Sequence, residues 1–198
     1  NYGMFTGIIE SIGKIESLNN NGGDIQVSIQ YDNNKLKNLE FGESISVNGI
    51  CLTLVNFDDI NITFDISRET LVKINPFKVK DYVNLETSLR FNGKISGHFV
   101  FGHVDGIVEL IDINQKDGCE VWAIKAPKSL IKYIAKKGSI SINGVSLTIN
   151  EINDDIFKIN LIPFTLEHTS FRFNKINDSL NIEIDMLARY VETILAKN

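Results

Sequence analysis

The chain has 198 residues, 43% of them hydrophobic and 23% charged, which fits one large globular domain or two small ones. No apolar run reaches the roughly 18 residues of a membrane-spanning helix, which disfavours a membrane protein. The net charge of −5 and the scattered lysines disfavour a nucleic-acid partner. The N-terminus also lacks a basic region followed by an apolar one, so we expect a cytoplasmic protein. Its two cysteines are too few for a disulfide scaffold, and that compartment would keep them reduced. Met4 opens a strand-like segment, so we expect it to be the natural start and residues 1–3 to be left from expression.

Short strands separated by tight turns dominate the pattern. Apolar and β-branched runs predict strands at Gln26–Gln30, Ser44–Val47, Leu52–Val55, Asn61–Ile66, Ser139–Ile142, Leu147–Asn150 and Ile156–Leu161. Asn-Gly pairs at Asn48-Gly49 and Asn143-Gly144 are strong hairpin signals. Many short strands with closely spaced turns are typical of Greek-key barrels or sandwiches.

Helical periodicity occurs in two places. One is Lys128–Lys136, which Gly138 should end. The other is Met186–Ala196, which carries an apolar stripe and follows Asp185 as a possible N-cap.

An internal repeat organises the chain. Residues 44–54 (SISVNGICLTL) align with residues 139–149 (SISINGVSLTI) at an offset of 95, and the remaining differences are conservative. The same offset aligns residues 7–10 with 102–105, and a nearly equal one aligns residues 84–86 with 181–183. The repeat predicts two tandem β domains followed by a helix: residues 1–100, 101–185 and 186–198.

The repeated hairpin also has the chemistry of a binding edge. After each Asn-Gly turn, alternation places Cys51 with Thr53, and Ser146 with Thr148, on one face of the next strand. A thiol in one copy and a hydroxyl in the other make two related sites chemically unequal. Metal binding is not expected, because His98 and His103, five residues apart on a strand, would point to opposite faces.

These segments resemble riboflavin synthase over nearly the whole chain. The resemblance is carried by residues 4–10 (MFTGIIE), 47–53 (VNGICLT), 97–105 (GHFVFGHVD), 137–140 (KGSI), 143–148 (NGVSLT) and 161–166 (LIPFTL). It implies an all-β fold of two six-stranded Greek-key barrels with a C-terminal α-helix that holds a homotrimer. It also implies active sites between the first barrel of one subunit and the second barrel of its neighbour.

The implied reaction is a dismutation without metal or organic cofactor. Two molecules of 6,7-dimethyl-8-ribityllumazine react by four-carbon transfer, giving riboflavin and 5-amino-6-(D-ribitylamino)uracil in the last step of riboflavin biosynthesis. Lumazine synthase is a candidate partner by the same resemblance. The alternative function is a non-catalytic, fluorescent lumazine- or flavin-binding antenna protein.

Several side chains are candidates for catalysis. A thiol is more nucleophilic than a hydroxyl near neutral pH, so Cys51 is the preferred nucleophile, although a lone cysteine is more often structural. His103 is the preferred proton shuttle, with a satisfied core histidine as the alternative. The further candidates, by resemblance, are Ser146, Ser44, Thr148 and Asp185. We expect His98 to fix the interdomain connection and His168 to lie on the surface.

The resemblance also implies binding positions in each barrel. For the first barrel they are Gly7, Ile8, Ile9, Cys51, Leu52, Thr53, Asp65, Ile66, Ser67, Arg68, Glu69 and Thr70. For the second they are Gly102, His103, Val104, Lys137, Ser146, Leu147, Thr148, Leu161, Ile162, Pro163, Phe164, Thr165 and Leu166. Backbone groups at strand ends could bind the pyrimidinedione edge, and polar side chains the ribityl chain. Ser96, Phe101 and Phe164 depart from the family pattern; at Phe164 an aromatic side chain replaces a polar one.

Overall fold

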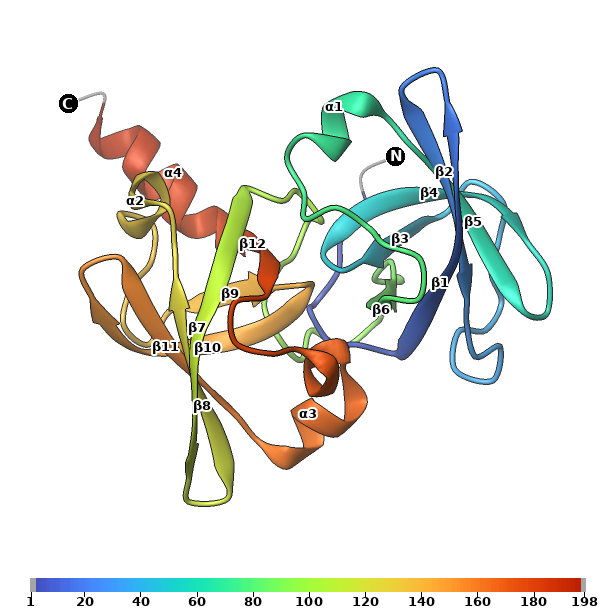
Figure 1. Cartoon of the computed structure of the whole chain (residues 1–198). Coiled ribbons are helices and arrows are strands. Elements are labelled where there is room, and N and C mark those ends of the chain that lie inside the picture. The colour runs from blue at the N-terminus through green and yellow to red at the C-terminus, as the bar shows by residue number, and fades with distance from the viewer. Residues whose placement is uncertain (1–2, 197–198) are drawn as a thin grey trace.

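The computed structural model describes residues 3–196 and consists of two closed antiparallel barrels followed by a helix (Figure 1). The first barrel contains β1 (Ser11–Asn21), β2 (Asp24–Gln30), β3 (Ser44–Val47), β4 (Ile50–Phe57), β5 (Asn61–Ile66) and β6 (Tyr82–Thr87). The second contains β7 (Gly106–Lys116), β8 (Cys119–Lys125), β9 (Ser139–Ile142), β10 (Val145–Asn153), β11 (Ile156–Leu161) and β12 (Ser179–Ile184). The first barrel closes in the order β1-β2-β5-β4-β3-β6, and the second repeats this order. Because β2 neighbours β5 rather than β3, the connectivity is a Greek key, as the sequence predicts.

The duplication extends to local backbone geometry. Asn48 and Gly49 have φ of 47° and 78°, and Asn143 and Gly144 have φ of 45° and 80°. Two consecutive residues with positive φ define the hairpin turn that Asn-Gly favours, which confirms both predicted turns. The paired strands also carry bulges at equivalent positions, at 15–17 and 110–112 and at 54–56 and 149–151.

Each barrel has its own apolar core. In the first, Ile15, Phe64 and Leu85 are fully buried, and in the second Trp122 and Phe157 are fully buried. Alternation along β4 and β10 buries every second residue and leaves the intervening side chains at the barrel surface. The chemistry-bearing face of each strand is therefore outside its own core.

One predicted helix is shorter than expected. The periodicity over 128–136 predicts a helix, but α2 covers only Lys128–Ile131. Tyr133 and Ile134 donate to the carbonyls three residues earlier, and Lys137 has φ of 68°. The segment therefore continues as tight turns, which still bury the apolar side chains that produce the periodicity. The shorter elements that the sequence pattern did not identify are α1 (Arg68–Leu71), α3 (Pro163–His168) and the 3-10 turn Ser170–Phe173.

The last helix, α4 (Met186–Leu195), begins as predicted. Asp185 caps it by accepting a hydrogen bond from the Leu187 N–H at 2.9 Å. On the barrel side, Glu192 accepts a hydrogen bond from the Tyr133 hydroxyl at 2.9 Å, and Arg189 pairs with Asp105. The opposite face exposes Leu187, Tyr190, Val191, Ile194 and Leu195, each more than half exposed. No described helix is long and apolar enough to cross a membrane.

Equivalent asparagines join the two barrels. Asn84 donates from its amide to the Asn143 carbonyl at 2.9 Å, and Asn181 donates to the Asn48 carbonyl at 3.0 Å. The Asn84 side-chain oxygen accepts from the Ser170 N–H at 2.6 Å. Because these side chains are 1–2% exposed and their partners are backbone groups of the other barrel, the barrels dock in one defined orientation.

Candidate functional site

The segment that precedes each barrel packs on the other barrel. The Cys51 N–H on β4 donates to the Gly102 carbonyl at 2.9 Å, and the Ser146 N–H on β10 donates to the Gly7 carbonyl at 2.8 Å. Gly102 and Gly7 have φ of 71° and 75°, and a Cβ on either would lie 2.6 Å from the Cβ of its partner. The structure therefore packs Gly7–Ile9 on the second barrel and Gly102–Val104 on the first, whereas the sequence grouped each segment with the other barrel.

The apolar residues that follow these glycines show the same exchange. Val104 packs against the core of the first barrel, and Ile9 packs against the core of the second. The sequence offset aligned these residues correctly, but it could not show that the chain crosses between barrels before it enters each one.

Five sequence candidates meet in one pocket on the first barrel. This pocket has a volume of about 250 Å³ and is lined by Cys51, Thr70, Gly102, His103 and Val104, with Ile50, Lys73 and Ile74 completing its wall. Cys51 is half-buried and His103 is exposed. A thiol and an imidazole are the side chains that serve as nucleophile and proton carrier in enzymes, and both line this one small concave site. Lys73 and Ile74 belong to no predicted motif.

The corresponding residue of the second barrel, Ser146, has a different partner. Its hydroxyl is hydrogen-bonded to Nδ1 of His98 at 2.7 Å. Burial lowers the pKa of His98, and the nearby Asp185 carboxylate opposes this effect. His98 lies in the connection between barrels, as expected, but it also contacts the candidate hydroxyl. His98 lies beside Ser146 because the chain crosses from one barrel to the other. The sequence does not show this crossing, so it predicted only a role in the connection for His98.

The other three catalytic candidates, Ser44, Asp185 and Thr148, each lie in a different part of the structure. Ser44 is buried next to Gly3, where an added Cβ would lie 2.6 Å from the Ser44 Cβ. Asp185 caps α4, and Thr148 is exposed on β10 opposite Ser139. Among residues 3–196, no cluster of three or more His, Cys, Asp or Glu side chains could hold a metal ion.

The first barrel's expected binding segment, residues 65–70, reaches its pocket mainly at its end. Asp65 accepts a hydrogen bond from Gln26 at 2.9 Å, Ser67 caps α1, and Glu69 pairs with Lys73. The Arg68 N–H is bound to Asp24 at 2.9 Å, whereas Thr70 lines the pocket beside Cys51. Of residues 65–70, Thr70 is therefore the one that lines this pocket.

Four of the expected binding residues point into the cores and could offer a ligand only backbone groups. These are Leu52, Ile66, Leu147 and Leu161. Thr53 and Lys137 are exposed. Around α3, Ile162, Pro163 and Phe164 are exposed, while Leu166 packs against the second core and Thr165 is half-buried. Phe164 stacks on His168 with ring centroids 4.0 Å apart, and His168 is exposed, as expected.

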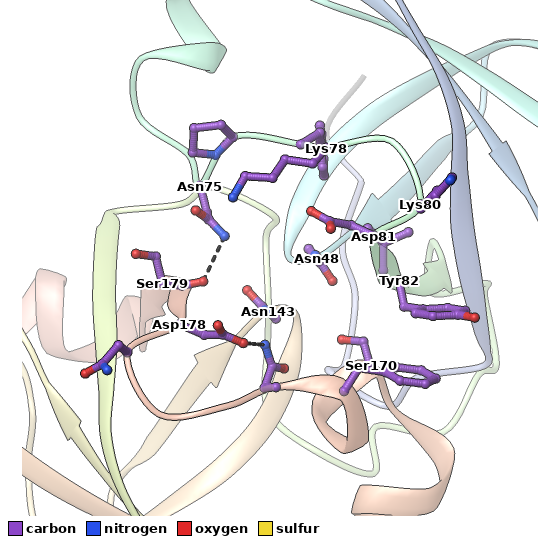
Figure 2. A pocket seen from close by; sticks show the side chains of 16 residues that line it. Asn48, Asn75, Lys78, Lys80, Asp81, Tyr82, Asn143, Ser170, Asp178 and Ser179 are labelled. Carbon is purple, nitrogen blue, oxygen red and sulfur yellow. Dashed lines mark hydrogen bonds between the residues drawn. The ribbon is translucent and has the colours of Figure 1, made fainter.

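A larger pocket, of about 340 Å³, lies between the barrels and contains none of the candidate residues (Figure 2). Asn48 and Asn143 from the two hairpin turns line it, and at one side of it Asn75 donates to the Ser179 carbonyl at 2.8 Å. The buried Ser170 hydroxyl, which also belongs to a lining residue, has no hydrogen-bond partner within residues 3–196. The lining is polar and holds neither a cysteine nor a histidine, which suits bound solvent better than catalysis.

Comparison with known proteins agrees with the duplicated architecture. The lumazine binding domain family matches twice, at residues 6–88 and 101–185. Riboflavin synthase of Bacillus subtilis is 40% identical over 196 residues, covering 98% of this chain and 91% of the relative. That of Photobacterium phosphoreum is 39% identical over 195 residues, covering 97% and 89%.

Solved structures agree as well. LumP complexed with riboflavin superposes with a TM-score of 0.82 at 29% identity, covering 91% of this chain and 98% of LumP. LumP complexed with 6,7-dimethyl-8-(1'-D-ribityl) lumazine gives a TM-score of 0.81 at 27% identity. By its two matched domains and its full-length relatives, the chain belongs to the riboflavin synthase family of lumazine-binding proteins.

Proposed function

We propose that the chain is a transferase that converts two molecules of 6,7-dimethyl-8-ribityllumazine into riboflavin and 5-amino-6-(D-ribitylamino)uracil. The observation that carries this proposal is the pair of equivalent but unequal sites, Cys51 with His103 on one barrel and Ser146 with His98 on the other. A dismutation needs two copies of one substrate, one as donor and the other as acceptor of four carbons. Two related sites of different chemistry match that requirement.

The residue roles follow from their chemistry. The C7 methyl of one lumazine is acidic because its carbanion is delocalised into the pteridine, and we assign the transfer of this proton to His103, which lines the pocket with Cys51. The Cys51 thiol in the same pocket is the nucleophile that activates C7 of a lumazine. In the second site, the His98–Ser146 pair offers a polarised hydroxyl for hydrogen bonding to the ring. Ser44, Thr148 and Asp185 remain candidates for orienting the substrates.

We further propose a homotrimer in which active sites form between the first barrel of one subunit and the second barrel of the next. The exposed apolar stripe on α4 supports this, because a helix of 10 residues with that face in water is marginal alone. The two unpaired cysteines support a cytoplasmic location. Lumazine synthase as a partner stays a prediction from the resemblance.

An antenna protein that only binds the ligand is the second candidate, because the LumP structures hold riboflavin and a lumazine. The full-length matches to riboflavin synthases favour catalysis instead. Incubating the purified chain with 6,7-dimethyl-8-ribityllumazine and recording riboflavin absorbance separates the two. A synthase forms one riboflavin per two lumazines consumed, whereas unchanged lumazine would support the antenna.

A further inference from the structure

Two buried glutamates, which end the repeat-matched segments 84–86 and 181–183, have no role in either site described above. Glu86 on β6 and Glu183 on β12 are equivalent in the repeat and are 4% and 5% exposed. Glu86 accepts hydrogen bonds from the Thr6 N–H at 2.7 Å, the Thr6 hydroxyl at 3.0 Å and the Gly7 N–H at 3.0 Å. Glu183 accepts from the Phe101 N–H at 2.7 Å and the His103 N–H at 3.0 Å.

The backbone that each carboxylate holds is the segment that crosses to the other barrel. Glu183, on the second barrel, binds N–H groups on both sides of Gly102, whose carbonyl accepts from Cys51 on the first barrel. Glu86, on the first barrel, binds the Gly7 N–H, and the Gly7 carbonyl accepts from Ser146 on the second barrel. Each glutamate therefore binds the short backbone segment that is itself hydrogen-bonded to a candidate residue on the opposite barrel. For Glu183 that residue is Cys51, and for Glu86 it is Ser146.

A carboxylate suits this place because every group around it is a donor. Its two oxygens offer about four acceptor positions and no donor, whereas a glutamine would turn an NH₂ group towards backbone N–H groups. Burial raises the pKa of both carboxyls to about 7, and the backbone N–H donors oppose this rise. Burial alone disfavours the charged form of a carboxyl group. When the group is charged, the poorly solvated surroundings let it hold a backbone segment firmly.

We propose that Glu183 and Glu86 are positioning residues that act across the barrels: Glu183 holds Gly102 and His103 against Cys51, and Glu86 holds Thr6 and Gly7 against Ser146. The inference deepens the proposed function and rests on it for its catalytic consequence. Neither glutamate touches the candidate reacting atoms. Each acts through the segment that it binds.

Thiol reactivity tests this geometry without reference to catalysis. In a Cys119→Ser background, Cys51 is the only thiol, and its rate of modification by a small maleimide reports how closely Gly102–Val104 covers it. We expect Glu183→Gln to change that rate at least fivefold. Glu86→Gln should leave it within twofold, because Glu86 holds the segment on Ser146. Equal effects of the two variants, or no effect of Glu183→Gln, would overturn the proposal.

A reciprocal probe tests the second site. With Cys51→Ser, Cys119→Ser and Ser146→Cys, the single thiol should respond to Glu86→Gln and not to Glu183→Gln. Glu43→Gln is the control, because the Glu43 carboxylate also accepts a backbone N–H, at 2.7 Å, but from Glu40 within its own loop. If a glutamine variant does not fold, the aspartate variant replaces it in the same comparison. Aspartate keeps the charge, but its shorter side chain draws the carboxylate oxygens away from the backbone N–H groups.

Turnover gives the second readout. With both cysteines present, Glu183→Gln and Glu86→Gln should each lower kcat at least tenfold, with a smaller change in KM, while Glu43→Gln matches the parent. Unchanged kcat in both variants would contradict the positioning role. If the parent protein forms no riboflavin, the proposed function fails, and the thiol measurements still decide whether the glutamates position the two segments.

Discussion

Replacing Gly102 with alanine should damage the first barrel's site through two separable effects. Gly102 has φ of 71°, and an alanine in this left-handed region costs roughly 1–2 kcal/mol. Its Cβ would also lie 2.6 Å from both the Cβ and the backbone nitrogen of Cys51. Because the Cys51 N–H donates to the Gly102 carbonyl, relief of this contact must move the segment around Gly102 away from β4, at an overpacking cost of about 1–3 kcal/mol.

Gly22 provides a matched control for the backbone cost. It has φ of 66°, and a Cβ there would meet nothing within 4 Å. Urea unfolding should therefore show that Gly102→Ala destabilises the chain by about 1–3 kcal/mol more than Gly22→Ala. Turnover should fall at least tenfold in Gly102→Ala alone, since a shift of about 1 Å at a reacting group can cost 100-fold. Equal stability and equal turnover of the two variants would refute the close packing of Gly102 on Cys51.

Three other predictions test the roles of the thiol, the helix and the buried carboxyls. Cys51→Ser should lower turnover far more than ligand affinity, measured by parallel kinetics and lumazine fluorescence titration; unchanged turnover would remove Cys51 from the mechanism. Deleting residues 186–198 should give monomers or dimers by analytical ultracentrifugation, because the exposed stripe of α4 is lost; a trimer that persists would mean that the helix has no role in assembly. The carboxyl pKa values of about 7 exceed the ordinary 4.5, so the folded state binds more protons between these values and stability falls as pH rises through that window. Each group should contribute on the order of 3 kcal/mol to this change, and Glu86→Gln with Glu183→Gln should flatten the pH dependence of unfolding; an unchanged slope would contradict the raised pKa values.

Local sequence signals predicted the hairpins well. Asn-Gly turns and β-branched alternation depend on nearby residues, so both repeated hairpins and the exposed faces of Cys51 and Ser146 were predictable. The strands β1, β6, β7, β8 and β12 were not identified by pattern, because several combine polar and charged residues with their apolar ones. The repeat nevertheless indicated that both halves have one fold.

The composition of each site depends on tertiary structure that the sequence pattern does not contain. The sequence aligned Gly7 with Gly102 but could not show that each packs on the opposite barrel. His98 and Glu183 make contacts with residues 48 and 80 or more positions away, so the sequence segments that contain them could not show these partners. Candidates within one hairpin were therefore predictable, whereas partners from the crossing segments required the fold.

The central claim is that each chain offers two ligand sites that work as a pair. Isothermal titration calorimetry with a non-reacting lumazine analogue tests it directly, with the same protein preparation assayed for riboflavin formation from 6,7-dimethyl-8-ribityllumazine. We predict a stoichiometry near two per chain together with product formation. A stoichiometry near one without riboflavin would contradict the claim and support an antenna protein.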